Sequence, residues 1–166
     1  MKTWLERSHE EQRLLNPSFC AVLLWNSASG YRRQSHDSGS LPFPEAFLVL
    51  PAVLHAETRN SLPRSITTSL AVWVEENPLS RAVIRDRARL LVPFTKEAIL
   101  FGLTHKIFRL YRGGISAEPQ WKQKIEATVE ASDEVEFCAK RATFLGRWFA
   151  KTGDVETVMA LLGVRP

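Results

Sequence analysis

Helix start and stop signals recur along this chain and constrain its fold more than any other feature. The dipeptide Asn-Pro occurs at positions 16–17 and again at 77–78, each time before a stretch with helical spacing. Asparagine is a preferred N-cap, and proline is favoured at the first helical position because the amide proton it lacks would have no helical acceptor. Toward the C-terminus, Ser132 and Asp154 each precede an apolar helical pattern that ends at a glycine. These signals predict a mainly α-helical chain.

One stretch departs from the helical pattern. Residues 108–117 alternate as a strand does around Gly113 and Gly114, which is typical of a β-hairpin. We therefore expect a mainly α fold, a single compact multi-helix domain of about six or seven helices with one small β-hairpin. The hairpin would be the wing of a winged-helix-like arrangement around residues 65–117.

The length of the chain, 166 residues, is usual for one domain, so we expect one folded unit over residues 1–166. Residues 30–41 are polar and rich in glycine and serine, and Gly30 is expected to end the preceding helix. The unit should thus contain an N-terminal helix at 1–15, an exposed loop at 30–41, the hairpin or wing at 108–117 and a C-terminal helical pair at 132–166.

The apolar runs of the chain are too short to cross a membrane. The longest, residues 19–25 and 46–54, fall well below the ~20 residues that a bilayer requires. The first residues pass straight into charged side chains, without the apolar region of a secretory signal. We therefore expect a cytoplasmic protein without a membrane partner, in which Cys20 and Cys138 are small buried hydrophobes.

Residue types that carry out chemistry are scattered through the sequence. The histidines, His9, His36, His55 and His105, fit no metal-binding motif, and no Cys-x-x-Cys pair occurs. Neither of the glycine patterns that bind phosphate is present. The sequence therefore predicts no catalytic residue, no cofactor and no metal site, and we expect that the protein is not an enzyme.

Positive charge is concentrated on one predicted helix and on the wing. Arg81, Arg85 and Arg89 recur every fourth residue and so share one helical face, while Arg109 and Arg112 add charge to the hairpin. With a formal net charge of +4, such a stripe would suit either the phosphates of a nucleic acid or the acidic side chains of a protein. Both kinds of contact stay open.

Gly146 stands inside an apolar helical stripe. A glycine in the middle of a helix costs up to ~1 kcal/mol relative to alanine. Close packing against another helix is a physical reason to keep it, and we predict such packing at this position.

Several longer stretches of the chain resemble a known protein family. They are residues 16–24 (NPSFCAVLL), 47–55 (FLVLPAVLH), 62–65 (LPRS), 146–153 (GRWFAKTG) and 162–166 (LGVRP). Through them the chain resembles the middle-component family of ABC-three-component conflict systems, in register from residue 16 to residue 166. The closing Gly-Arg-Trp-Phe and Gly-Val-Arg-Pro pieces are the most distinctive.

The resemblance implies a small non-catalytic adaptor in an anti-phage or anti-plasmid defence complex. In such systems, which include Lamassu-like ones, a middle component is encoded between an SMC- or Rad50-like ABC ATPase and an effector such as a nuclease. The middle component is expected to bridge these two partners. Contact with DNA inside the complex stays open.

A bridging subunit needs surfaces that bind other chains. Arginine and tryptophan are enriched where binding energy concentrates, so the candidate contact residues are Arg81, Arg85, Arg89, Arg109, Arg112, Trp4, Trp121 and Arg147. Trp73 and Trp148 are expected in the core instead. The alternative function is a free-standing, winged-helix-like DNA-binding regulator, which should bind DNA alone with a steep dependence on salt.

Overall fold

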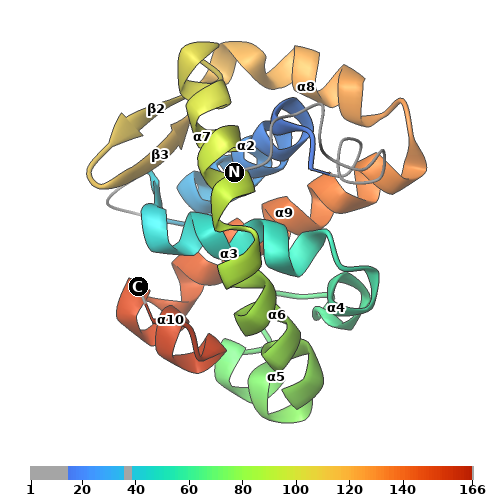
Figure 1. Ribbon diagram of the computed structural model, residues 1–166, viewed down its shortest axis with the longest axis vertical. Coiled ribbons are helices and arrows are strands. Elements are labelled where there is room, and N and C mark those ends of the chain that lie inside the picture. Colours follow the sequence, from blue (N-terminus) through green and yellow to red (C-terminus); the bar gives the residue numbers. More distant parts are fainter. Residues whose placement is uncertain (1–14, 36–38, 166) are drawn as a thin grey trace.

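The computed structural model describes residues 15–35 and 39–165, and in this part of the chain helices dominate (Figure 1). The helices are α2 (Pro17–Gln34), α3 (Phe43–Val53), α4 (Ala56–Ser61), α5 (Leu70–Glu76), α6 (Pro78–Leu90), α7 (Val92–Thr104), α8 (Lys122–Val129), α9 (Asp133–Thr152) and α10 (Val155–Leu162). A 3-10 turn, η2 (Pro119–Trp121), and the strands β1 (Leu41–Pro42), β2 (Phe108–Tyr111) and β3 (Gly114–Ala117) complete them. The mainly α prediction is confirmed, with more and shorter helices than expected.

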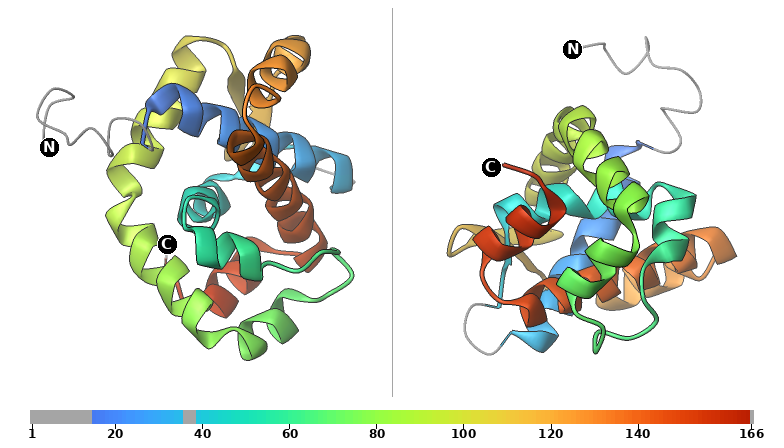
Figure 2. Two further views of the ribbon diagram at one scale, coloured as in Figure 1. Left: turned by 90° about the vertical axis from the view of Figure 1, so that its right-hand side faces the viewer. Right: turned by 90° about the horizontal axis from the view of Figure 1, so that it is seen from below.

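Helix α2 lies between α7 and α9 and packs against both (Figures 1 and 2). Apolar residues cover most of its circumference, and Cys20, Leu23 and Leu24 are fully buried. A helix that is apolar nearly all round has to be surrounded by other elements. Its Trp25 donates the indole N–H to the carbonyl oxygen of Glu118 at 3.0 Å, which connects α2 to the chain that leaves the sheet.

Two glycines let α2 and α9 cross at close range. A Cβ atom at Gly146 of α9 would overlap the carbonyl oxygen of Ser27 in α2 and lie 2.9 Å from the amide nitrogen of Tyr31. A Cβ atom at Gly30 of α2 would overlap the carbonyl oxygen of Thr143 in α9. The close packing predicted at Gly146 is confirmed.

The prediction that a loop begins at Gly30 is wrong. Helix α2 continues to Gln34, because Gly30 serves the contact with α9 and does not end the helix. The connection to β1 is therefore shorter than the predicted loop at 30–41, and its residues 36–38 lie outside the described part of the chain.

The predicted hairpin at 108–117 is confirmed, and a short strand extends it. β2 and β3 pair antiparallel, and the two turn residues, Arg112 and Gly113, have φ angles of 45° and 74°. Positive φ at both positions is the geometry of a type I′ hairpin turn. β1 pairs with the other edge of β3, Leu41 opposite Ile115, so that the strand order is β1-β3-β2.

The winged-helix-like arrangement predicted around residues 65–117 stays a prediction. The sheet extends beyond that range, because β1 pairs with β3; α2 precedes β1, and α7 directly precedes the hairpin. The α3–α6 segment lies between β1 and α7. α6 and α7 run end to end through Leu91 as one curved rod (Figure 2), so they are not the two crossing helices of a helix-turn-helix.

The C-terminal pair predicted at 132–166 is confirmed as α9 and α10. Asp154 caps α10, its Oδ1 accepting a hydrogen bond from the Thr157 amide at 2.8 Å. Gly163 ends α10 in the left-handed conformation, at φ 70°, which glycine adopts without strain. The helix predicted at 1–15 lies outside the described residues, except for Leu15.

The two tryptophans assigned to the core are there. Trp73 and Trp148 are each 2% exposed and meet edge to face, with ring centroids 5.6 Å apart. Each indole N–H has a carbonyl acceptor, that of Ser61 for Trp73 and that of Thr68 for Trp148. Cys20 and Cys138 are buried, as predicted, and no disulfide joins them. Among the described helices, none is both long and apolar enough to span a membrane.

Candidate partner-binding surfaces

Among the described side chains of types that perform chemistry, His55 and His105 make structural contacts and Cys20 is buried. His55 caps α4, its Nδ1 accepting from the Thr58 amide at 3.3 Å. His105 stacks on Phe101, with ring centroids 4.1 Å apart. Burial raises the pKa of the Cys20 thiol to about 12, which disfavours the nucleophilic thiolate. Within residues 15–35 and 39–165, no three histidine, cysteine or acidic side chains group as metal ligands.

The arginine stripe of α6 divides into three different environments. Arg81 is half-buried beside the C-terminal end of α10, where a Cβ atom on Gly163 would lie 3.4 Å from its Nη2. Its charge there complements the negative end of the helix dipole. Arg85 is exposed and donates from Nε to Asp86 at 3.0 Å. Arg89 is exposed at the edge of a groove described below.

The wing arginines lie apart from this stripe. Arg109 pairs with Glu118 at 3.3 Å, and the guanidinium of Arg112 lies 5.4 Å from the ring centroid of Tyr111. The hairpin follows the C-terminal end of α7, whereas α6 joins its N-terminal end (Figure 1). Arg147 is exposed on α9. The predicted arginines therefore do not form one continuous basic surface.

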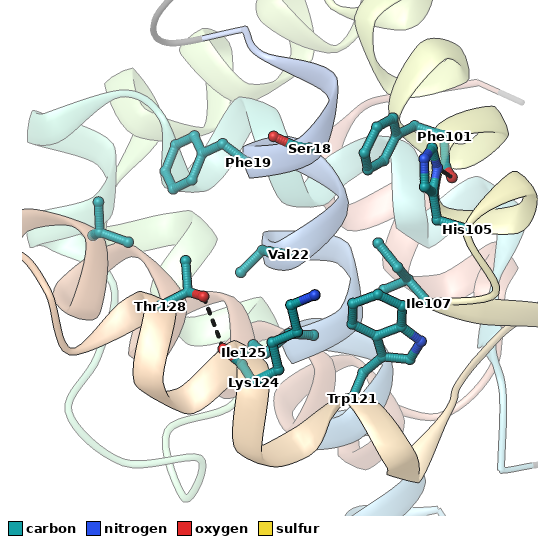
Figure 3. Close-up of a pocket in the computed structure, with 11 residues that line it drawn as sticks. Ser18, Phe19, Val22, Phe101, His105, Ile107, Trp121, Lys124, Ile125 and Thr128 are labelled. Atoms are coloured by element: carbon teal, nitrogen blue, oxygen red, sulfur yellow. Dashed lines mark hydrogen bonds between the residues drawn. The ribbon is translucent and has the colours of Figure 1, made fainter.

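An apolar groove of about 420 Å³ opens at the C-terminal end of α7, and we call it the α2–α8 groove (Figure 3). It is lined by Ser18, Phe19, Val22, Phe101, His105, Ile107, Trp121, Lys124, Ile125, Thr128 and Val135. The predicted contact residue Trp121 is thus one of its walls. Figure 3 shows Trp121 and the stacked Phe101 and His105 on one side and Phe19 on the other. Lys124 places its Nζ 4.9 Å from the Trp121 ring centroid.

A second apolar groove, of about 330 Å³, opens at the N-terminal end of α7. We call it the α3–α10 groove, and its lining residues are Phe43, Pro44, Phe47, Ala88, Arg89, Val92, Met159, Val164 and Arg165. Three separate parts of the chain build it: the start of α3, the junction of α6 with α7, and α10 with the residues that follow. Arg89, predicted as a contact residue, stands at its edge with Arg165.

Large apolar side chains also lie open on the α6–α7 rod. Leu79, Leu90 and Leu100 are 82%, 71% and 64% exposed. Around Leu100, the exposed positions of α7 one turn away are Lys96 and Thr104. The outer face of α7 thus combines one basic, one apolar and one small polar residue, which suits a protein contact better than a phosphate backbone.

Sequence reasoning found some of these residues and missed others. Arg89 and Trp121 each line a groove, while Trp4 lies outside the described residues. The exposed leucines and Arg165 were not predicted. A leucine on the polar side of a helical pattern can be recognised from the sequence as an exposed apolar residue. The grooves cannot be recognised in this way, because the segments that line them are far apart in the sequence.

The family model for ABC-three component (ABC-3C) system Middle Component 3 matches residues 4–166. No curated protein matches the chain, and no solved structure does.

Proposed function

Because the chain belongs to the Middle Component 3 family of ABC-three component systems, we propose that it is the adaptor that holds the other two components together. Family membership makes it a middle component of a defence or conflict system that works with other ABC-3C components. The finer proposal is that it bridges an SMC- or Rad50-like ABC ATPase and an effector such as a nuclease, in the cytoplasm, as Lamassu-like systems would require.

Two separate apolar grooves carry this proposal. The α2–α8 groove adjoins the C-terminal end of α7 at Phe101, and the α3–α10 groove adjoins its N-terminal end at Val92. Since an α-helix rises 1.5 Å per residue, these two positions are about 14 Å apart along the helix axis. No residue in the described part of the chain lines both grooves. Non-overlapping apolar surfaces allow two chains to bind at once, as a bridge requires.

We also propose that the subunit performs no catalysis itself. The support comes from the described side chains, since His55 caps a helix and the Cys20 thiol is buried with a raised pKa. A general base or nucleophile needs a free lone pair directed into an accessible site. In the proposed complex, ATP hydrolysis and the effector reaction belong to the partners.

The alternative function, a free-standing DNA-binding regulator, has less support than the adaptor function. In a winged-helix protein the helix before the wing is the one that enters a DNA groove. Here that helix is α7, which exposes Leu100, whereas the arginine stripe lies on α6. The wing arginines are also engaged, Arg109 with Glu118 and Arg112 beside Tyr111.

Co-purification with the other components of its own system tests the adaptor function. We expect the tagged chain, co-expressed with the ATPase and the effector, to elute with both in one complex. The ATPase and effector expressed without it should not co-elute, because the bridge is missing. A chain that elutes alone in the presence of both components, and that shifts duplex DNA with a steep salt dependence, would instead identify a regulator.

A further inference from the structure

We propose that the α3–α10 groove is the docking site for an acidic segment of one partner subunit. The segment inserts one large apolar side chain into the groove and pairs its carboxylates with Arg89 and Arg165. This inference rests on the proposed adaptor function and assigns the chemistry of one of its two contacts.

The floor of the groove is apolar and preformed. α3 contributes Phe43 and Phe47, α7 contributes Val92, and α10 with its following turn contributes Met159 and Val164. Backbone hydrogen bonds hold the outer walls, from Val164 N to Met159 O at 3.0 Å and from Phe43 N to the carbonyl oxygen of Gly113 at 3.2 Å. A preformed apolar floor loses little conformational entropy on binding and favours insertion of an apolar side chain.

The edge of the groove carries unopposed positive charge. Arg89 and Arg165 are exposed, and neither forms an ion pair with another described residue. None of the described residues that line the groove is acidic. Arg81 adds a third guanidinium beside Gly163, next to the lining residue Val164. Guanidinium groups bind carboxylates through paired hydrogen bonds, so the complementary segment is acidic.

The α2–α8 groove differs from the α3–α10 groove in the charge at its edge. Among the described residues that line it, the one Lys or Arg is Lys124, whose ammonium already lies over the Trp121 ring. The two grooves should therefore accept segments of different chemistry. This difference would let an adaptor place each partner at its own end of α7.

Two other occupants fit the α3–α10 groove less well. A nucleic acid would pair with Arg89 and Arg165 but would supply no aliphatic side chain for the floor. A second copy of this chain, docked through the same groove about a twofold axis, would bring the arginines of both copies to one interface. Like charges at an interface oppose binding.

Charge reversal at the groove tests the proposal in the co-expressed complex. The variant carries Arg89→Glu and Arg165→Glu. The matched control carries Arg64→Glu and Lys151→Glu, which are also exposed, line neither groove and change the net charge equally. We expect the groove variant to lose one component by at least about tenfold in quantitative pull-down while it retains the other. The control should retain both.

The outcomes separate this inference from the adaptor function. If the wild-type chain retains neither component, the proposed adaptor function is contradicted, and so is the proposal that a partner's acidic segment binds the α3–α10 groove. If the wild type and the groove variant both retain both components, the groove assignment alone is overturned. Equal losses in the groove variant and the control would overturn it too, because net charge and not the groove would then decide retention.

Photocrosslinking identifies the occupant directly. With p-benzoylphenylalanine in place of Phe47, we expect a crosslink to the component that the groove variant loses. The crosslinked peptide should contain a large apolar residue flanked by aspartate or glutamate. A crosslink to a second copy of this chain or to nucleic acid, or a peptide without acidic residues, would overturn the proposal.

Discussion

Replacing Gly146 with alanine should lower the free energy of unfolding by about 3 kcal/mol, although alanine is the better helix former. The added Cβ atom would overlap the carbonyl oxygen of Ser27 and lie 2.9 Å from the amide nitrogen of Tyr31. Both neighbours are backbone atoms inside α2, so no side-chain rotation can relieve the overlap. α2 and α9 would have to move apart, and both are central to the core.

The measurement is thermal unfolding of the isolated protein. For a chain of this length, 1 kcal/mol corresponds to roughly 2–4 °C in Tm, so the loss should be roughly 6–12 °C. Gly30→Ala should act in the same direction through Thr143. Arg147→Ala is the matched control, because Arg147 is the next residue on α9 and is exposed. A Gly146→Ala variant as stable as the wild type would contradict the close crossing of the two helices.

Gly30 and Gly146 show which features of a helix can be predicted from the residues next to it in the sequence. Glycine ends many helices, so a polar stretch after Gly30 predicts a loop there. The residue that a Cβ atom at Gly30 would overlap is Thr143, more than a hundred positions later in the chain. Gly146, by contrast, stands between apolar residues at helical spacing, and that local pattern was enough to predict close packing.

The helix starts predicted at Asn16 and Asp154 have a side chain that accepts from a free amide of the first turn, whereas those predicted at Asn77 and Ser132 form no side-chain cap hydrogen bond. Asn16 accepts from the Ser18 amide at 2.9 Å, and Asp154 caps α10 in the same way. The type I′ turn of the hairpin was also predictable, because it depends on residues that are adjacent in the sequence. β1, at two residues, is too short to show alternation and exists through its pairing with β3.

The binding surfaces were less predictable, since residues from distant elements form them. Regular spacing placed Arg81, Arg85 and Arg89 on one face of α6, yet they meet different neighbours. Arg81 lies against α10, Arg85 pairs with Asp86, and Arg89 stands over the α3–α10 groove. What distinguishes them is the position of α10, which a helical pattern in α6 does not encode.

A buried carboxyl group lies next to the same groove. Glu45, in the first turn of α3, is fully buried, and neither of its carboxyl oxygens has a hydrogen-bond partner in the described part of the chain. Burial, and secondarily the charge of Asp154, raise the pKa of Glu45 from an ordinary 4.5 to about 8. At neutral pH the group is therefore mostly protonated. Its ionisation would place a charge between α3 and α10, the helices that wall the groove.

Ionisation of Glu45 should make stability fall as pH rises. Between pH 4.5 and pH 8 the folded chain holds a proton that the unfolded chain has released. Stability decreases with pH wherever the folded state binds more protons, so this contribution is fully present below pH 4.5 and lost by about pH 8. A pKa difference is worth 1.36 kcal/mol per pH unit, and pH 5 lies about three units below the folded pKa of about 8, so we expect a loss of about 4 kcal/mol between pH 5 and pH 8.5.

Glu45→Gln should remove this pH dependence, because the amide has the shape of the protonated carboxyl group and does not ionise. We expect the variant and the wild type to have similar Tm values at pH 5, and the variant to be more stable by roughly 8–16 °C at pH 8.5. Thermal unfolding across this range, with the exposed Glu75→Gln as the matched control, measures the difference. A variant less stable than the wild type at pH 8.5 would mean that Glu45 is ionised in the folded protein, held by a partner charge.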